Sequence, residues 1–122
     1  MAQHLPDHFA TLTHDVTVNL KALRADTPTL MKSFGDLARA ATQDGALNAK
    51  TKELIALALG VAGHCEACIG FHTEMLVRLG ASRQEVEEAL GVAVYMGGGP
   101  SLMYSASALA AFAEFDALAH PV

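Results

Sequence analysis

Residues 53–72 read ELIALALGVAGHCEACIGFH, a pattern of apolar and chain-breaking residues that indicates two helices joined by a short turn. The apolar run Leu54–Gly63 belongs to a helix of about 49–62, which Asn48 can cap at its N-terminus. The second half of that helix is apolar on all sides, so we expect it to be buried on most sides. The other helix starts near Cys65.

The same helical periodicity recurs along the rest of the chain, with capping and breaking residues between the periodic stretches. Thr27-Pro28 predicts an N-cap followed by proline at the first helical position, and Ser82 with Glu85 has the pattern of a capping box. Strand-like alternation is absent from the sequence. We therefore predict an all-α bundle of about six helices, covering approximately 8–24, 28 to Asp44, 49–62, 65–79, 83–96 and 101–118.

Each helix is expected to turn an apolar stripe towards a common core. No segment is a linker long enough to divide the chain, so we predict a single domain over residues 1–122. The apolar stripes are Phe9, Leu12, Val16, Leu20 and Leu23 in the first helix, Leu30, Met31, Phe34, Leu37, Ala38 and Ala41 in the second, and Val86, Ala89, Leu90, Ala93 and Val94 in the fifth.

Composition excludes several classes of protein. Hydrophobic residues make up 52% of the 122 residues, which is too many for a disordered chain. Only 17% are charged, and so thin a charge density suggests that part of the surface is buried in a homo-oligomer. The net charge of −5 and the scattered basic residues argue against binding to nucleic acid or to an anionic membrane.

Membrane insertion and secretion are not expected either. Met1–Asp7 has no basic segment followed by an apolar stretch, as a signal peptide would. The longest apolar run, Leu54–Gly63, is far shorter than the roughly 20 residues that span a bilayer. We expect a cytoplasmic protein. In such a reducing compartment, a close pair of cysteines is more often redox-active or metal-binding than structural.

The residues that carry chemistry share one helix face. Cys65, Cys68 and His72 are spaced i, i+3 and i+7, and the stripe continues as Ile69, Met75, Leu76 and Leu79, which we take as the core side. A thiol becomes reactive as the thiolate, which a nearby base favours. A helix N-terminus adds partial positive charge and favours the same anion.

Glu53 on the preceding helix belongs to the same constellation. It lies nine residues before Ala62, and His72 lies ten residues after it, so an antiparallel hairpin brings the two to similar heights. At ~1.5 Å per residue, Cys65 would lie about 9 Å lower. We therefore expect the Glu53 carboxylate to interact with His72 or Cys68 rather than with Cys65. A buried carboxylate bonded to the imidazole would orient it and raise its basicity.

The residues alone leave three interpretations of the cysteine pair open. It can be a redox pair, two buried small hydrophobic residues, or part of a metal site. Zinc needs four ligands, and Cys65, Cys68 and His72 with either Glu53 or His64 could supply them. Against zinc, its three main ligands would lie on one helix, whereas structural zinc sites usually join separate elements. His64 is expected to be exposed rather than catalytic.

The spacing Glu53-x11-Cys65-x2-Cys68-x3-His72, with the later stretch Val94–Met103, resembles the alkylhydroperoxidase AhpD-like proteins of the carboxymuconolactone decarboxylase superfamily. The resemblance covers about residues 28–118. It implies an all-helical fold that forms homotrimers or homohexamers, and a dithiol site that reduces peroxides. It also implies re-reduction by a lipoyl- or thioredoxin-like dithiol, with no cofactor and no metal.

The resemblance assigns each residue of the site a role. Cys68 would be the peroxide-reacting thiol, Cys65 the resolving thiol, His72 the base and Glu53 its orienting carboxylate. One position departs from the family's best-known peroxidases, which have a second histidine directly before the second cysteine. That position is Ala67 here, so the proton relay would be shorter.

Overall fold

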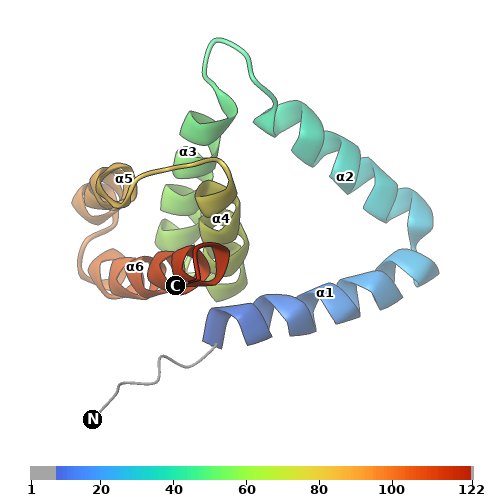
Figure 1. Ribbon diagram of the computed structural model, residues 1–122. Coiled ribbons are helices and arrows are strands. Elements are labelled where there is room, and N and C mark those ends of the chain that lie inside the picture. Colours follow the sequence, from blue (N-terminus) through green and yellow to red (C-terminus); the bar gives the residue numbers. More distant parts are fainter. Residues whose placement is uncertain (1–7, 122) are drawn as a thin grey trace.

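The computed structural model describes residues 8–121, so the expectation for Met1–Asp7 lies outside the described residues. Six helices and no strand fill this range, which confirms the prediction of an all-α fold. Figure 1 shows their arrangement. The helices are α1 (His8–Asp26), α2 (Pro28–Thr42), α3 (Ala49–Ala62), α4 (Glu66–Arg78), α5 (Arg83–Gly97) and α6 (Gly99–Ala119).

The core lies between α3, α4, α5 and α6, and α6 packs against all of the other three. Burying these apolar side chains is the main stabilising contribution to the fold. The buried hydrophobic residues are Phe9 from α1, Leu57 and Val61 from α3, Ile69, Leu76 and Val77 from α4, Val86, Leu90 and Ala93 from α5, and Ala108, Ala111, Phe112 and Phe115 from α6.

The first two helices form an arm beside this core (Figure 1). Within residues 8–121, α2 contacts only α1 and α3, and it has no buried residue. The expectation that its apolar stripe faces the core is therefore wrong for the single chain: Leu30, Phe34 and Leu37 are 63%, 65% and 64% exposed. In α1, Phe9 is buried as expected, whereas Leu23, where the arm leaves the core, is exposed.

Most helix ends follow the predicted capping pattern. The Asn48 side chain accepts a hydrogen bond from the Thr51 N–H at 2.8 Å, and Ser82 and Glu85 form the capping box of α5. Lys50 of α3 contacts the Glu85 carboxylate at 2.8 Å. Hydrogen bonds from Lys50 and from the Ser82 N–H lower the pKa of Glu85. Thr27 differs from the prediction, because its hydroxyl donates to the Leu23 carbonyl and does not cap α2.

Two further expectations need correction. The second half of α3 is not buried on most sides, since Leu59 is 67% exposed and Ala62 is exposed as well. Met75 of α4 and Leu79, which directly follows that helix, are exposed as well, so the buried stripe is narrower than predicted. A helix that packs on one side of a thin bundle leaves its outer face uncovered, however apolar that face is.

The break before the last helix is also shorter than predicted. Gly98 alone separates α5 from α6, and its backbone φ of 75° is one that residues other than glycine rarely adopt. The helix Gly99–Ala119 is long and apolar enough to cross a membrane by those two criteria. Its buried Ser101, Ser105 and Glu114, and its packing on four other helices, fit a core helix of the bundle.

A buried acidic side chain holds α1 against the bundle. Glu114 of α6 is 7% exposed, and its carboxylate accepts hydrogen bonds from the N–H groups of Phe9 and Ala10 at 3.2 and 2.7 Å. These are among the first amides of α1, which have no partner inside their own helix. A carboxylate also complements the positive end of the helix dipole. Glu114 thus caps α1 from a distant part of the chain.

Candidate active site

The turn between α3 and α4 determines where the cysteines lie. The Cys65 N–H donates to the Gly60 carbonyl at 2.9 Å, and the His64 N–H donates to the Val61 carbonyl at 3.1 Å. This pair of bonds defines a Schellman motif, which closes a helix with one residue in the left-handed conformation. That residue is usually glycine, but here it is His64, with φ of 57°. Holding a non-glycine residue there costs about 1–3 kcal/mol.

Cys65 follows this turn directly and is the N-cap residue of α4. Its sulfur accepts a hydrogen bond from the Cys68 N–H at 3.2 Å. The two cysteines are joined by a disulfide, with 5.2 Å between their Cα atoms. Both side chains are half-buried. The pair therefore lies at the positive end of a helix dipole, where a thiolate is stabilised after the disulfide is reduced.

The structure places Glu53 and His72 together, as the hairpin estimate predicts. Oε2 of Glu53 lies 2.6 Å from Nδ1 of His72. Glu53 is 7% exposed, and a carboxylate so deeply buried needs a hydrogen-bonded partner. An ionised carboxylate only accepts, so a neutral ring bonded to it carries its proton on Nδ1 and keeps a lone pair on Nε2. The arrangement can supply a base at Nε2.

Close approach of α3 and α4 brings the cysteines next to the helix that carries Glu53. A Cβ atom built on Gly60 would lie 3.1 Å from the Cβ of Cys68, closer than such atoms normally approach. Glycine at this position thus lets the first turn of α4 pack directly on α3. The disulfide and the Glu53–His72 pair are consequently carried by one tightly packed helical hairpin.

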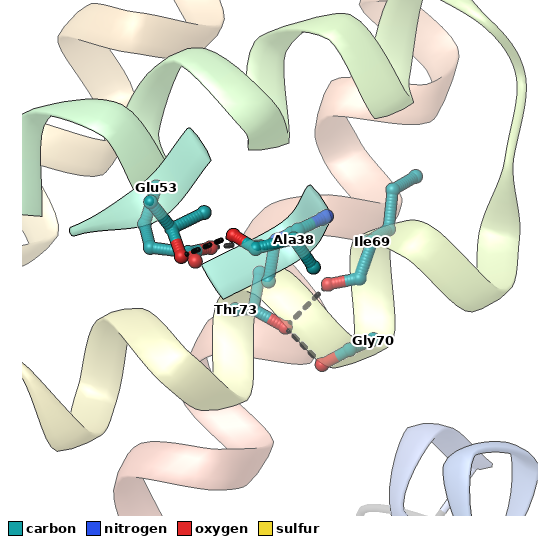
Figure 2. A network of polar contacts seen from close by, with 7 residues as sticks. Ala38, Glu53, Ile69, Gly70 and Thr73 are labelled. Carbon is teal, nitrogen blue, oxygen red and sulfur yellow. Dashed lines mark hydrogen bonds and ion pairs between the residues drawn. The ribbon is translucent and has the colours of Figure 1, made fainter. Parts of the chain in front are cut away.

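Below the site, α4 is fixed by its buried face. Thr73 is fully buried, and its hydroxyl lies 2.7 and 3.1 Å from the carbonyls of Ile69 and Gly70 (Figure 2). Gly70 lies against α1, since a Cβ built on it would meet Cγ2 of Thr13 at 2.7 Å. Sequence reasoning did not single out Thr73, and its β-branched hydroxyl side chain in a helix interior was the available signal.

His64 and Tyr104 form a second feature that sequence reasoning missed. Their rings stack face to face, with centroids 4.8 Å apart and planes 3° from parallel. Such aromatic contacts are worth about 0.5–1.5 kcal/mol beyond the area they bury. His64 is exposed, as expected, but it is not an isolated surface residue. No sequence signal joins the two residues, because they lie on elements far apart in the chain.

A groove between three helices lies apart from these residues. It runs between α1, α4 and α6 with a volume of about 460 Å³, and it is lined by residues that include His14, Phe71, Arg78 and Phe115. Neither cysteine lines it, and neither does Glu53 or His72. Within residues 8–121, no three histidine, cysteine, aspartate or glutamate side chains are grouped as metal ligands would be. The zinc interpretation therefore gains no support from the donor geometry.

A helical hairpin that carries a Cys-x-x-Cys disulfide, and a buried glutamate bonded to a half-buried histidine, is a combination typical of few classes of protein. A model of the carboxymuconolactone decarboxylase family matches residues 28–111, and the chain belongs to that family. The predicted resemblance is confirmed.

Two solved structures and a sequence relative support the same assignment. A carboxymuconolactone decarboxylase family protein from Legionella pneumophila is 58% identical, with a TM-score of 0.90 over 91% of this chain and 99% of that one. A Thermotoga maritima member of the family, for which a role in an antioxidative response has been suggested, is 28% identical, with a TM-score of 0.78 over 88% of this chain and 92% of that one. An uncharacterised protein from Cupriavidus necator is 46% identical over 97 residues, which are 80% of this chain and 83% of that protein.

Gly60→Ala tests the close packing at the site. Alanine normally stabilises a helix interior by about 0.5–1 kcal/mol relative to glycine, but here its methyl group would press on Cys68. We expect Gly60→Ala to be less stable than the wild type in urea unfolding. Gly91→Ala is the matched control, because a Cβ there meets no atom within 4 Å, and it should stabilise the protein. Equal gains for both variants would contradict the close packing.

Proposed function

We propose that the protein is a dithiol peroxidase that reduces hydroperoxides, with alkyl hydroperoxides as the substrate class. The observation that carries this proposal is the disulfide-forming pair Cys65–Cys68 at the start of a helix whose His72 is bonded to the buried Glu53. Membership of the family, and the antioxidative role suggested for the Thermotoga maritima relative, support it. A reducing compartment such as the cytoplasm would keep the pair available as thiols.

The first chemical step is attack by the Cys68 thiolate on the peroxide. A sulfur–oxygen bond forms, the oxygen–oxygen bond breaks, and Cys68 becomes a sulfenic acid. The leaving alkoxide takes up a proton and departs as an alcohol. In this proposal, Nε2 of His72 first accepts the Cys68 thiol proton and then returns it to the leaving oxygen, while Glu53 holds the ring through Nδ1.

The second step closes the disulfide. The Cys65 sulfur attacks the Cys68 sulfenic acid, the sulfur–sulfur bond forms, and water leaves. Two thiols are thereby oxidised by two electrons, and one hydroperoxide is reduced to an alcohol and water. A lipoyl- or thioredoxin-like dithiol then restores the pair by thiol–disulfide exchange and becomes a disulfide itself. With Ala67 before the second cysteine, this relay uses one histidine of the helix rather than two.

Two effects bear on which cysteine is the attacking thiol. Cys65 is the N-cap residue and gains from the helix dipole, which is worth about 0.3–1 kcal/mol. His72 lies one helical turn after Cys68 and two turns after Cys65. A positioned base accelerates proton transfer by about 10²–10⁴-fold, which exceeds the contribution of the dipole. Proximity to the base therefore supports Cys68 as the attacking thiol in this proposal.

Trapping the sulfenic acid tests this division of roles. In Cys65→Ser the resolving thiol is missing, so one equivalent of peroxide should leave a sulfenic acid on Cys68. Dimedone should label that residue, as detected by mass spectrometry of the digested protein. Cys68→Ser should stay unlabelled under the same conditions. A label on Cys65 in Cys68→Ser, with Cys65→Ser inert, would reverse the assignment.

Replacing the base tests the activity itself. His72→Gln should slow oxidation of the reduced dithiol by an alkyl hydroperoxide about 10²–10⁴-fold, because no group remains to accept the thiol proton. Stopped-flow thiol titration measures the rate. His120→Gln, which changes an exposed histidine at the end of α6, is the matched control and should match the wild type. Wild-type thiols that do not react with peroxide, in a protein that purifies with near-stoichiometric zinc, would refute the peroxidase proposal.

We also propose that the protein is a homo-oligomer, a trimer or hexamer as the family resemblance implies. The supporting observation is the uncovered apolar face of α2, formed by Leu30, Phe34 and Leu37. Contiguous exposed apolar side chains on one helix are typical of a protein–protein interface. The low share of charged residues, 17%, fits the same proposal.

Light scattering at micromolar concentration should give a mass well above the 12.8 kDa of one chain. Phe34→Glu places a charge in the centre of the α2 face and should lower that mass. Ser33→Glu introduces the same residue one position away on the exposed helix and should not. A wild-type protein that behaves as a monomer would contradict the proposal.

A further inference from the structure

We propose that the stacked rings of His64 and Tyr104 form a positioning pair that sets the thiol–disulfide equilibrium of Cys65 and Cys68. The inference deepens the proposed function, since it rests on the pair acting as a reversible dithiol. Neither residue would touch the peroxide in this proposal. Their effect would be exerted through the backbone that precedes Cys65.

The first support is the conformation of His64. Its φ of 57° places a side chain other than glycine in the left-handed region, at the one residue between the end of α3 and Cys65 that must adopt it. Such a conformation persists only where surrounding contacts favour it. The Tyr104 ring, whose centroid lies 4.8 Å from that of His64, makes such a contact with the His64 side chain.

The second support is the place of Tyr104. It is half-buried on α6 and packs against the hydrophobic core, so the core holds its ring. Because α6 makes extensive contact with α4, the stack joins the turn before Cys65 to the same helix that supports the rest of the site. Within residues 8–121 neither ring forms a side-chain hydrogen bond, so the contact depends on the ring faces rather than on the tyrosine hydroxyl.

In this proposal, the His64–Tyr104 stack acts mainly on the protein in which Cys65 and Cys68 are reduced to thiols. The turn fixes Cys65 as the N-cap residue of α4, where its sulfur accepts the Cys68 N–H. A fixed turn keeps one sulfur near the other after the disulfide is reduced, and this proximity raises the effective concentration of each thiol for the other. Loss of the stack would free Cys65 in the dithiol and so favour the reduced form. The disulfide would then accept two electrons and two protons from a dithiol reagent more readily.

Equilibration of the full-length protein in dithiothreitol buffers of graded redox composition, followed by alkylation and mass spectrometry, measures this equilibrium. Tyr104→Ala should shift it about two- to tenfold towards the dithiol, the factor that corresponds to loss of one aromatic stack. Tyr104→Phe keeps a ring and should match the wild type. Tyr95→Ala removes the other tyrosine, which is 84% exposed, and should also leave the equilibrium unchanged.

A second variant separates positioning from general loss of stability. His64→Gly removes the stack but relieves the left-handed strain, so its unfolding midpoint in urea should equal or exceed that of the wild type while the equilibrium still shifts towards the dithiol. Adding Tyr104→Ala to His64→Gly should then have no further effect.

Three results would overturn the inference: an unshifted equilibrium in Tyr104→Ala, an equal shift in Tyr104→Phe, or full additivity of the two changes. All of these measurements are made without peroxide. Failure of the peroxidase proposal would appear instead as thiols that are inert to hydroperoxide, with the redox equilibrium and its dependence on Tyr104 intact.

Discussion

The carboxylate of Glu53 imposes the constraint on which the rest of the site depends. A charged group that is 7% exposed loses its hydration, and the loss is tolerated only when a hydrogen-bonded partner replaces the water. That partner is Nδ1 of His72. Because the two residues lie on different helices, their bond fixes the relative height of α3 and α4. His72 then lies one helical turn from Cys68 and two turns from Cys65.

The turn between the two helices meets a different demand. It must end α3, reverse the chain and start α4 with few residues, and a Schellman motif does this when one residue is left-handed. Glycine would fit that position with less strain, yet the chain has His64 there and supports it with Tyr104. A residue with a side chain restricts the backbone of this turn more than glycine would. Order at this point is useful when a thiol must stay beside its partner between oxidation and reduction.

Much of this arrangement could be predicted from the sequence, because it depends on local spacing. The helix N-terminus at Asn48 and the pairing of Glu53 with His72 follow from capping chemistry and from the rise per residue of a helix. Exposure of Phe34 could not be predicted, since a periodic pattern shows that a face is apolar and not what covers it. Glu114 and the His64–Tyr104 stack depend on contacts between distant segments. A lone acidic residue between Phe112 and Phe115 was the available signal for Glu114.

Finally, the buried residues of α4 and the residues of the candidate site lie on neighbouring faces of the same helix. Ile69, Thr73 and Leu76 are fully buried, whereas Cys65, Cys68 and His72 form a half-buried row beside them. One residue along a helix corresponds to a rotation of about 100°, so the row of site residues runs along the edge of the core. At such an edge the Glu53–His72 bond is shielded from water on one side, which strengthens it. The disulfide on the same edge is half-buried and so keeps part of its surface exposed to solvent.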